Sequence, residues 1–194
     1  GQVLQAGCGQ NPARQVALGA GLPVSIGATT INKVCGSSLK AAMMAANSIT
    51  AGKSKVVIAG GTESMSNAPQ LLVGQRKGRK MGDSTLVDSM IHDGLWDVYN
   101  DIHMGNTGEI VADEYGITRT DSDEFAVRSH QRAAEAWNQG WFDWETFGLG
   151  VPQRGGDEIS FTKDEGIKPG SDVETLANLR PVFNSSGQVT AGNA

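Results

Sequence analysis

One cysteine stands where a predicted strand gives way to a predicted helix. Cys35 lies in the segment NKVCGSS, residues 32–38, after an Ile- and Thr-rich stretch and just before a helical pattern. A thiol at that junction faces the unpaired N–H groups and the positive end of the helix dipole, which favours the nucleophilic thiolate. Gly36 lets the chain turn sharply and lets a substrate approach the backbone. Cys35 is therefore a candidate nucleophile, although these residues alone also fit a small buried hydrophobic side chain.

The second cysteine is less well placed for chemistry. Cys8 also follows an extended segment, but the next helix begins only after Asn11, so we expect a structural role for it. The two cysteines lie 27 positions apart without CxxC spacing, which indicates neither a disulfide framework nor a zinc site. A reducing environment fits this pattern better.

The elements around Cys35 alternate between strand and helix patterns. We expect strands over residues 1–6, 25–32 and 55–59, the last an apolar run typical of a buried parallel strand. Helices are expected over residues 11–20, with Asn11 as N-cap and Gly21 as stop, and over residues 37–51, buried on a broad face and ended by Gly52. This β-α-β-α-β order predicts an α/β domain with a largely parallel sheet.

The pattern changes after Gly61. Residues 67–94 read as loop with short helices, including a basic cluster over residues 76–80 that fits a solvated loop or an oligomer contact. Helices are expected over residues 104–115, ended by Gly116, and over residues 121–139, introduced by Thr120. Residues 141–166 read as irregular with one short strand near Ile159. This part is expected to be a separate, mainly helical subdomain.

Composition narrows the function classes. Sixteen basic against 21 acidic residues give a net charge of −5, which argues against a nucleic-acid partner. No apolar run approaches the roughly 20 residues of a membrane span. Because the chain starts at Gly1 and stops at Ala194 in mid-pattern, we expect it to be part of a longer protein, and a targeting signal is left open.

Five motifs, in order, resemble those of the thiolases. They are NKVCGSSLKA at residues 32–41, GGTESMS at 60–66, HMG at 103–105, LRPVF at 179–183 and VTAGNA at 189–194. Any one of them alone would be a weak signal. The resemblance runs over all 194 residues.

The resemblance implies a thiolase-like fold, a parallel or mixed sheet of β-α-β units with an inserted, mainly helical loop domain. The expected parts are an α/β core over residues 1–66 that carries the nucleophile, a loop domain over 67–184 that binds coenzyme A, and a return strand over 185–194. The family's activating histidine and its second cysteine would lie outside this chain. Cys35 would take an acyl group from one acyl-CoA and pass it to the deprotonated α carbon of a second, by a ping-pong mechanism.

The family's positions for coenzyme A, carried over residue by residue, are Leu95, His103, Met104, Lys168, Thr175 and Ala191. Coenzyme A would be a substrate, with no tightly bound cofactor. Lys168 stands where many members have Arg, so stacking on the adenine is in question there. The segment DVYN at residues 97–100 resembles potassium-responsive members, which would hold K⁺ by Tyr99 and by the carbonyls near Ala191, Gly192 and Ala194.

The activity implied is that of an acetyl-CoA C-acyltransferase of lipid metabolism, of the short-chain acetoacetyl-CoA type. One alternative is a longer-chain 3-ketoacyl-CoA thiolase of β-oxidation. Another, from a different class, is a non-catalytic thiolase-fold protein that binds acyl-CoA or lipid. The resemblance further implies a homodimer or homotetramer in the cytoplasm, with mitochondrial or peroxisomal placement left open, and no nucleic-acid or membrane partner.

Overall fold

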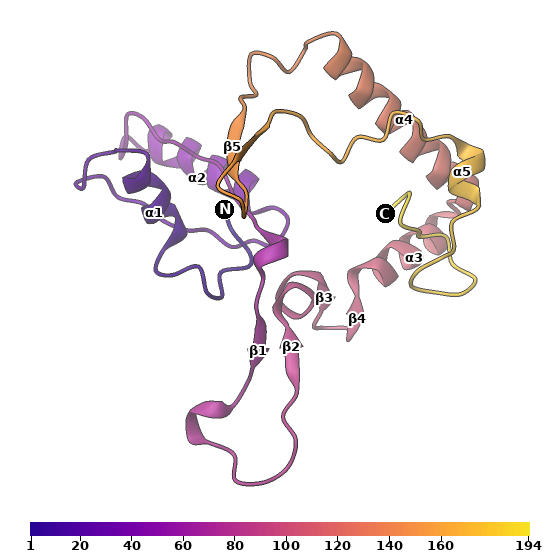
Figure 1. Ribbon diagram of the computed structural model, residues 1–194, viewed down its shortest axis with the longest axis horizontal. Helices are drawn as coiled ribbons and strands as arrows, with labels where there is room; N and C mark the ends of the chain where they lie inside the picture. Colours follow the sequence, from indigo (N-terminus) through magenta and orange to yellow (C-terminus); the bar gives the residue numbers. More distant parts are fainter. The chain divides into compact units, whose positions relative to one another are not determined.

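The computed structural model describes all residues from 1 to 194, which divide into two compact units, Gly1–Asp101 and Ile102–Ala194 (Figure 1). Helices and short strands occur in both units. The three-part division expected from the sequence, with its return strand over residues 185–194, stays a prediction.

The first unit holds two helices at the predicted places. Helix α1 (Pro12–Gly19) begins after Asn11, whose side chain accepts a hydrogen bond from the Arg14 N–H. Helix α2 (Ser37–Thr50) begins directly after Gly36, two residues beyond Cys35. The prediction that α2 is buried on a broad face is wrong, because Ser37 is its only buried residue and Leu39 and Met43 are largely exposed.

The strands predicted over residues 1–6, 25–32 and 55–59 do not form continuous ladders. The run at 55–59 is extended but not buried, since the side chains of Val56 and Ile58 are 84% and 79% exposed. A buried parallel strand needs a neighbour on each side and a layer over each face, and this unit leaves Val56 and Ile58 uncovered.

These extended segments nevertheless meet at one end. The Gly1 N donates to the Gly60 carbonyl at 2.8 Å, and the Thr62 N–H donates to the Gly1 carbonyl at 3.1 Å, which is the bonding pattern of two parallel strands. On the other side, the Gln2 N–H donates to the Ile31 carbonyl at 3.0 Å. Residues 1–2 thus lie between the chain that leads to Cys35 and the glycine pair that follows residues 55–59.

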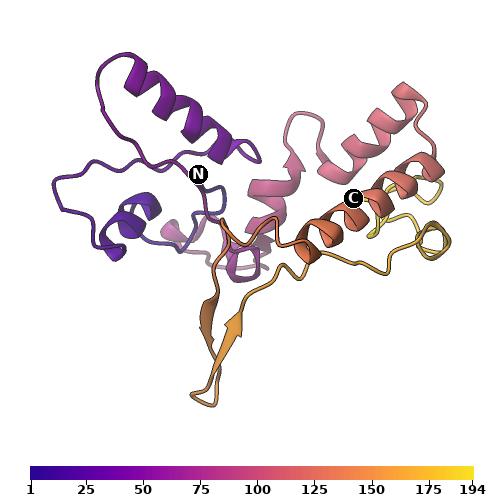
Figure 2. The ribbon, with the colours of Figure 1, turned by 90° about the horizontal axis from the view of Figure 1, so that it is seen from above.

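Two antiparallel hairpins occur where loops or irregular chain were expected. Strands β1 (Gln70–Leu72) and β2 (Leu86–Asp88) are the arms of a long hairpin whose loop carries the short helix η2 (Gln75–Lys77), as Figure 1 shows. Strands β5 (Leu149–Pro152) and β6 (Glu158–Phe161) form a second hairpin, which projects from the helices of its unit in Figure 2. The short strand predicted near Ile159 is confirmed as β6. The remaining short elements are η1 (Met65–Asn67), the π-helix η3 (Ile91–Leu95), β3 (Trp96–Asp97) and β4 (Ile102–His103).

The second unit is built on helices α3 (Met104–Tyr115), α4 (Arg119–Asn138) and α5 (Val173–Ala177). Helix α3 has the predicted bounds. Helix α4 starts two residues earlier than predicted, because Thr118 and not Thr120 is its N-cap. The Thr118 hydroxyl accepts from the Asp121 N–H, and the Asp121 carboxylate accepts from the Thr118 N–H, a reciprocal capping box.

A glycine with a left-handed backbone follows each of the four long helices: Gly21, Gly52, Gly116 and Gly140. After α2, the Gly52 N–H donates to the Ile49 carbonyl and the Lys53 N–H donates to the Ser48 carbonyl, at 3.0 and 2.9 Å. This pair of bonds satisfies carbonyls that the end of a helix leaves without partners. The stops predicted at Gly21, Gly52 and Gly116 are confirmed.

The hydrophobic core is small in both units. Its buried apolar side chains are Leu4, Ala17, Ala112, Val127, Ala136 and Leu176, the last four contributed by α3, α4 and α5. None of the helices combines the length and the apolar character that crossing a bilayer would require.

Candidate active site

The backbone turns sharply just before Cys35. Val34 has a φ of 46°, in the left-handed region that β-branched residues rarely adopt. Such a residue is held in place only where the surroundings impose the conformation, and such sites cluster where a side chain must be presented to a substrate. The turn ends at Gly36, and α2 starts at once. The sequence-based expectation of a sharp turn between an extended segment and a helix is confirmed.

Ser37 fixes this turn. Its hydroxyl accepts from the Lys33 N–H at 2.9 Å and donates to the Val34 carbonyl at 2.6 Å, while the side chain is only 5% exposed. The Asn32 side chain adds a further bond, because its Oδ1 accepts from the Val34 N–H at 2.9 Å. The residues on both sides of the strained Val34 are therefore tied to one another.

The thiol of Cys35 is free and exposed, and it borders an open hollow of about 300 Å³. The start of α2 lines the same hollow, and no side chain caps that helix end. First-turn N–H groups without a side-chain acceptor are suited to bind an anion or an oxygen that gains negative charge. The full lining is Gly1, Gln2, Val3, Val34, Cys35, Ser37, Ser38, Gly61, Thr62 and Glu63.

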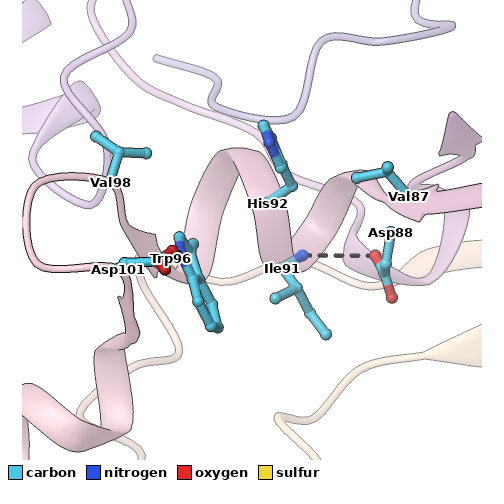
Figure 3. Close-up of a pocket in the computed structure, with 7 residues that line it drawn as sticks. All are labelled: Val87, Asp88, Ile91, His92, Trp96, Val98 and Asp101. Carbon is cyan, nitrogen blue, oxygen red and sulfur yellow. Dashed lines mark hydrogen bonds between the residues drawn. The ribbon is translucent and has the colours of Figure 1, made fainter. Parts of the chain in front are cut away.

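A larger hollow, of about 460 Å³, lies elsewhere in the first unit, around η3 (Figure 3). Its two carboxylates are already engaged, since Asp88 accepts from the N–H groups of Met90 and Ile91 and Asp101 accepts from the Trp96 ring N–H. The labelled side chains point in different directions rather than toward one spot. Because this hollow has no thiol or hydroxyl side chain, the smaller one at Cys35 is the better candidate for bond chemistry.

Cys8 is held in a local backbone turn. Its sulfur donates to the Leu4 carbonyl at 3.4 Å and accepts from the Gln2 side-chain amide at 3.3 Å. No helix begins next to it. These contacts fit the structural role expected from the sequence.

In the second unit, His103 and Met104 stand at the start of α3. The His103 Nδ1 accepts from the Gly105 N–H at 3.0 Å, so the ring caps the helix. It also stacks on Phe183, with ring centroids 4.7 Å apart. Gly105 lies so close to Phe183 that an added Cβ would overlap the ring. The motifs at residues 103–105 and 179–183 are therefore in contact.

Lys168 and Thr175 lie on either side of the Asp172 N-cap of α5. The Lys168 side chain is exposed, and its Nζ donates to the Glu165 carbonyl at 3.0 Å. The Thr175 N–H donates to the Asp172 carboxylate at 2.7 Å. That bond is the main reason why the pKa of Asp172 is below its ordinary value. Both predicted residues are accessible to a ligand.

Ala191, Gly192 and Ala194 belong to a turn that a buried network holds. Asn193 donates to the Asp123 carboxylate at 2.8 Å, and the same carboxylate accepts from the Arg119 Nε at 2.8 Å. The Arg119 guanidinium also donates to the carbonyls of Leu176 and Leu179, so the turn is connected through α4 to α5. Asp123 is only 1% exposed, so the carboxylate at the centre of this network is deeply buried.

Leu95 and Tyr99 lie in the first unit. Leu95 is the half-buried last residue of η3, and the Tyr99 ring is almost fully exposed. The Tyr99 N–H and the Asn100 side chain donate to Asp97, and the Asn100 amide is the main cause of the lowered pKa of that carboxyl. No group of three or more His, Cys, Asp or Glu side chains is close enough together to hold a metal ion.

Sequence reasoning missed the polar side chains that hold these segments together: Glu63, Glu109, Asp123 and Asn193. Glu63 and Asn193 lie inside two of the five motifs named above, so their positions were a signal that these side chains have a structural role near the site. Glu109 and Asp123 lie within helices and carry no local signal, because their partners are distant in the sequence.

Comparison with known proteins places these features in a family. The whole chain, residues 1–194, matches the thiolase N-terminal domain. An acetyl-CoA acetyltransferase of Cupriavidus necator is 56% identical over 194 residues, and one of Pseudomonas aeruginosa is 53% identical. A probable acetyl-CoA acyltransferase of Staphylococcus aureus is 52% identical. Each alignment covers 100% of this chain and 49% of the relative, so the chain spans about half the length of these proteins. The chain belongs to the thiolase family, of which it carries the N-terminal domain.

Proposed function

We propose that the protein of which this chain is a part is an acetyl-CoA C-acetyltransferase, with Cys35 as the nucleophile. The observation that carries the proposal is the placement of a free, exposed thiol at a strained turn, next to a hollow and at the start of a 14-residue helix. The relatives named above support the acetyl group as the one transferred.

The proposed reaction has two steps. The Cys35 thiolate attacks the carbonyl carbon of acetyl-CoA, the bond from that carbon to the coenzyme A sulfur breaks, and the coenzyme A thiolate takes up a proton. A base then removes an α proton from a second acetyl-CoA, and the resulting carbanion attacks the acetyl group on Cys35. The Cys35 thiolate leaves and acetoacetyl-CoA forms. The reverse sequence cleaves acetoacetyl-CoA, and the base is proposed to come from the rest of the longer protein.

Covalent labelling tests the nucleophile. When the full-length protein is mixed with radiolabelled acetyl-CoA, we expect label on the peptide that contains Cys35 and none on the peptide that contains Cys8. Cys35→Ser should abolish turnover while the protein stays folded, because a hydroxyl has almost no anionic form at neutral pH. Cys8→Ser is the matched control and should keep its activity. Label on Cys8, or more than about a tenth of the activity in Cys35→Ser, would contradict the assignment.

We further propose that Leu95, His103, Met104, Lys168, Thr175 and Ala191 bind coenzyme A. The exposed Lys168 side chain offers a cation to a phosphate, and the contact of His103 with Phe183 offers an apolar wall for the pantetheine arm. Lys168→Ala should raise KM for acetyl-CoA with little change in kcat, because a remote contact binds ground and transition states alike. An unchanged KM at low salt would contradict the role of Lys168.

Three finer points complete the proposal. The backbone carbonyls of Ala191, Gly192 and Ala194 accept no hydrogen bonds, so they offer oxygen donors of the kind that K⁺ takes, and a role for Tyr99 is proposed from the family resemblance alone. Replacing K⁺ by tetramethylammonium would then raise the KM for acetyl-CoA.

A homodimer or homotetramer is proposed from the family resemblance, and light scattering would measure the oligomeric state. The two free thiols fit a reducing cytoplasm.

A further inference from the structure

A glutamate in the hollow of Cys35 uses both of its oxygens on backbone N–H groups. The Glu63 Oε2 accepts from the Val3 N–H and its Oε1 accepts from the Leu4 N–H, each at 2.9 Å. A carboxylate supplies two acceptors at this spacing, whereas the amide of a glutamine would turn an NH₂ group against one of the N–H donors. The charge also makes both bonds stronger than neutral ones.

This carboxylate holds one wall of the hollow in place. It fastens residues 3–4 to the segment at 60–63, beside the parallel bonds of Gly1 with Gly60 and Thr62. The Gln2 N–H carries the connection to Ile31, four residues before Cys35. Gly61 completes the wall, since it lies so close to the first turn of α2 that an added Cβ would overlap the Ser38 hydroxyl.

We infer that Glu63 is a positioning residue for the acyl transfer to Cys35. It acts through the backbone of residues 1–4 and 60–62, which sets the distance between the thiol, the start of α2 and the wall opposite. Each of its oxygens accepts a backbone N–H group, so we assign it a positioning role rather than that of the base or of a direct contact of the acyl group. The inference rests on the proposed role of Cys35 as the nucleophile.

The second unit contains a matched control. Glu109 accepts from the N–H groups of Gln188 and Val189 at 2.8 and 2.9 Å, the same two-oxygen contact at a place remote in sequence from the thiol. Glu63→Gln and Glu109→Gln therefore remove the same interaction with the same isosteric change. In the full-length protein, p-nitrophenyl acetate is the acyl donor of choice, because a small ester acylates the thiol without needing the coenzyme A contacts.

Glu63→Gln is expected to slow the acylation of Cys35 by p-nitrophenyl acetate about tenfold at a temperature where the protein is folded, because misplacing a reacting group by about 1 Å costs up to roughly 100-fold. Glu109→Gln should acylate at the wild-type rate even if its melting temperature falls. Glu63→Asp keeps both acceptors and should recover part of the rate, which covers the case in which the glutamine variant does not fold.

Equal acylation rates in wild type, Glu63→Gln and Glu63→Asp would overturn the inference while leaving the role of Cys35 intact. An equal loss in Glu63→Gln and Glu109→Gln would also overturn it, because the effect would then be one of general stability. Mass spectrometry of the acylated protein tests the role of Cys35 separately from that of Glu63. An acetyl group found on Cys8 rather than Cys35 would remove the proposed function itself.

Discussion

Replacing Ser37 with alanine should loosen the turn that presents Cys35. The change removes the bond from the Lys33 N–H and the bond to the Val34 carbonyl, both of them made by a buried hydroxyl. Each such bond contributes about 1 kcal/mol, so the local cost is about 2 kcal/mol. Since 1.4 kcal/mol is a factor of ten, opening of the turn should become roughly 30-fold more frequent. The strain at Val34 favours that opening further.

Hydrogen exchange followed by mass spectrometry measures this opening directly in the full-length protein. The peptide that covers residues 33–36 should exchange roughly 30-fold faster in Ser37→Ala than in the wild type. Ser38→Ala is the matched control, because none of the hydrogen bonds that hold the turn involves the Ser38 hydroxyl, so its loss should leave the exchange of this peptide unchanged. Exchange within about twofold of the wild type in Ser37→Ala would refute the view that this hydroxyl holds the turn.

Three other perturbations test separate contacts. Hydrogen bonds from the Thr118 side chain and, second, from the Thr118 N–H lower the pKa of Asp121 from its ordinary value of 3.8. The capping box therefore stabilises α4 fully above pH 3.8 and loses that effect as the pH falls through the lowered pKa, and an NMR titration of the carboxyl should give a midpoint under 3.8. Asp123→Ala removes a buried carboxylate from its ion pair with the part-exposed Arg119 and from its bond with Asn193. It should lower the free energy of unfolding by roughly 1 to 3 kcal/mol in urea titrations, and no measurable loss would argue against the network. Gly105→Ala adds a methyl group that would overlap the Phe183 ring, and it should lower the free energy of unfolding by about 1 to 3 kcal/mol in the same titration.

Local chemistry made part of this structure predictable. Asn11 and the glycines that stop α1, α2 and α3 act on neighbouring backbone groups, so a short stretch of sequence contains the whole interaction. The turn at Cys35 is of the same kind, because all of its bonds lie within residues 32–37. The N-cap of α4 was predicted wrongly because both Thr118 and Thr120 precede the helical pattern. The capping box of Thr118 with Asp121 is what makes Thr118 the N-cap.

Contacts between distant residues were not predictable in the same way. Glu63 lies 60 positions from Val3, and Glu109 lies 80 positions from Val189, so no period or spacing connects them. The prediction that residues 55–59 are buried was wrong for a related reason. An apolar run indicates that a segment can be covered, but the cover must come from another part of a protein, and in this unit Val56 and Ile58 have none.

The two fixed ends of α2 make its length a constraint of its own. The turn at Val34–Ser37 sets where the helix begins, and the left-handed Gly52 sets where it stops, so the 14 residues between them have no freedom to slip. Deleting one residue within the helix would rotate everything beyond it by about 100° and withdraw it by about 1.5 Å. Either the turn before the helix or the stop at Gly52 would then lose its hydrogen bonds. Point substitutions on the exposed face should accordingly be tolerated far better than any insertion or deletion between Ser37 and Thr50.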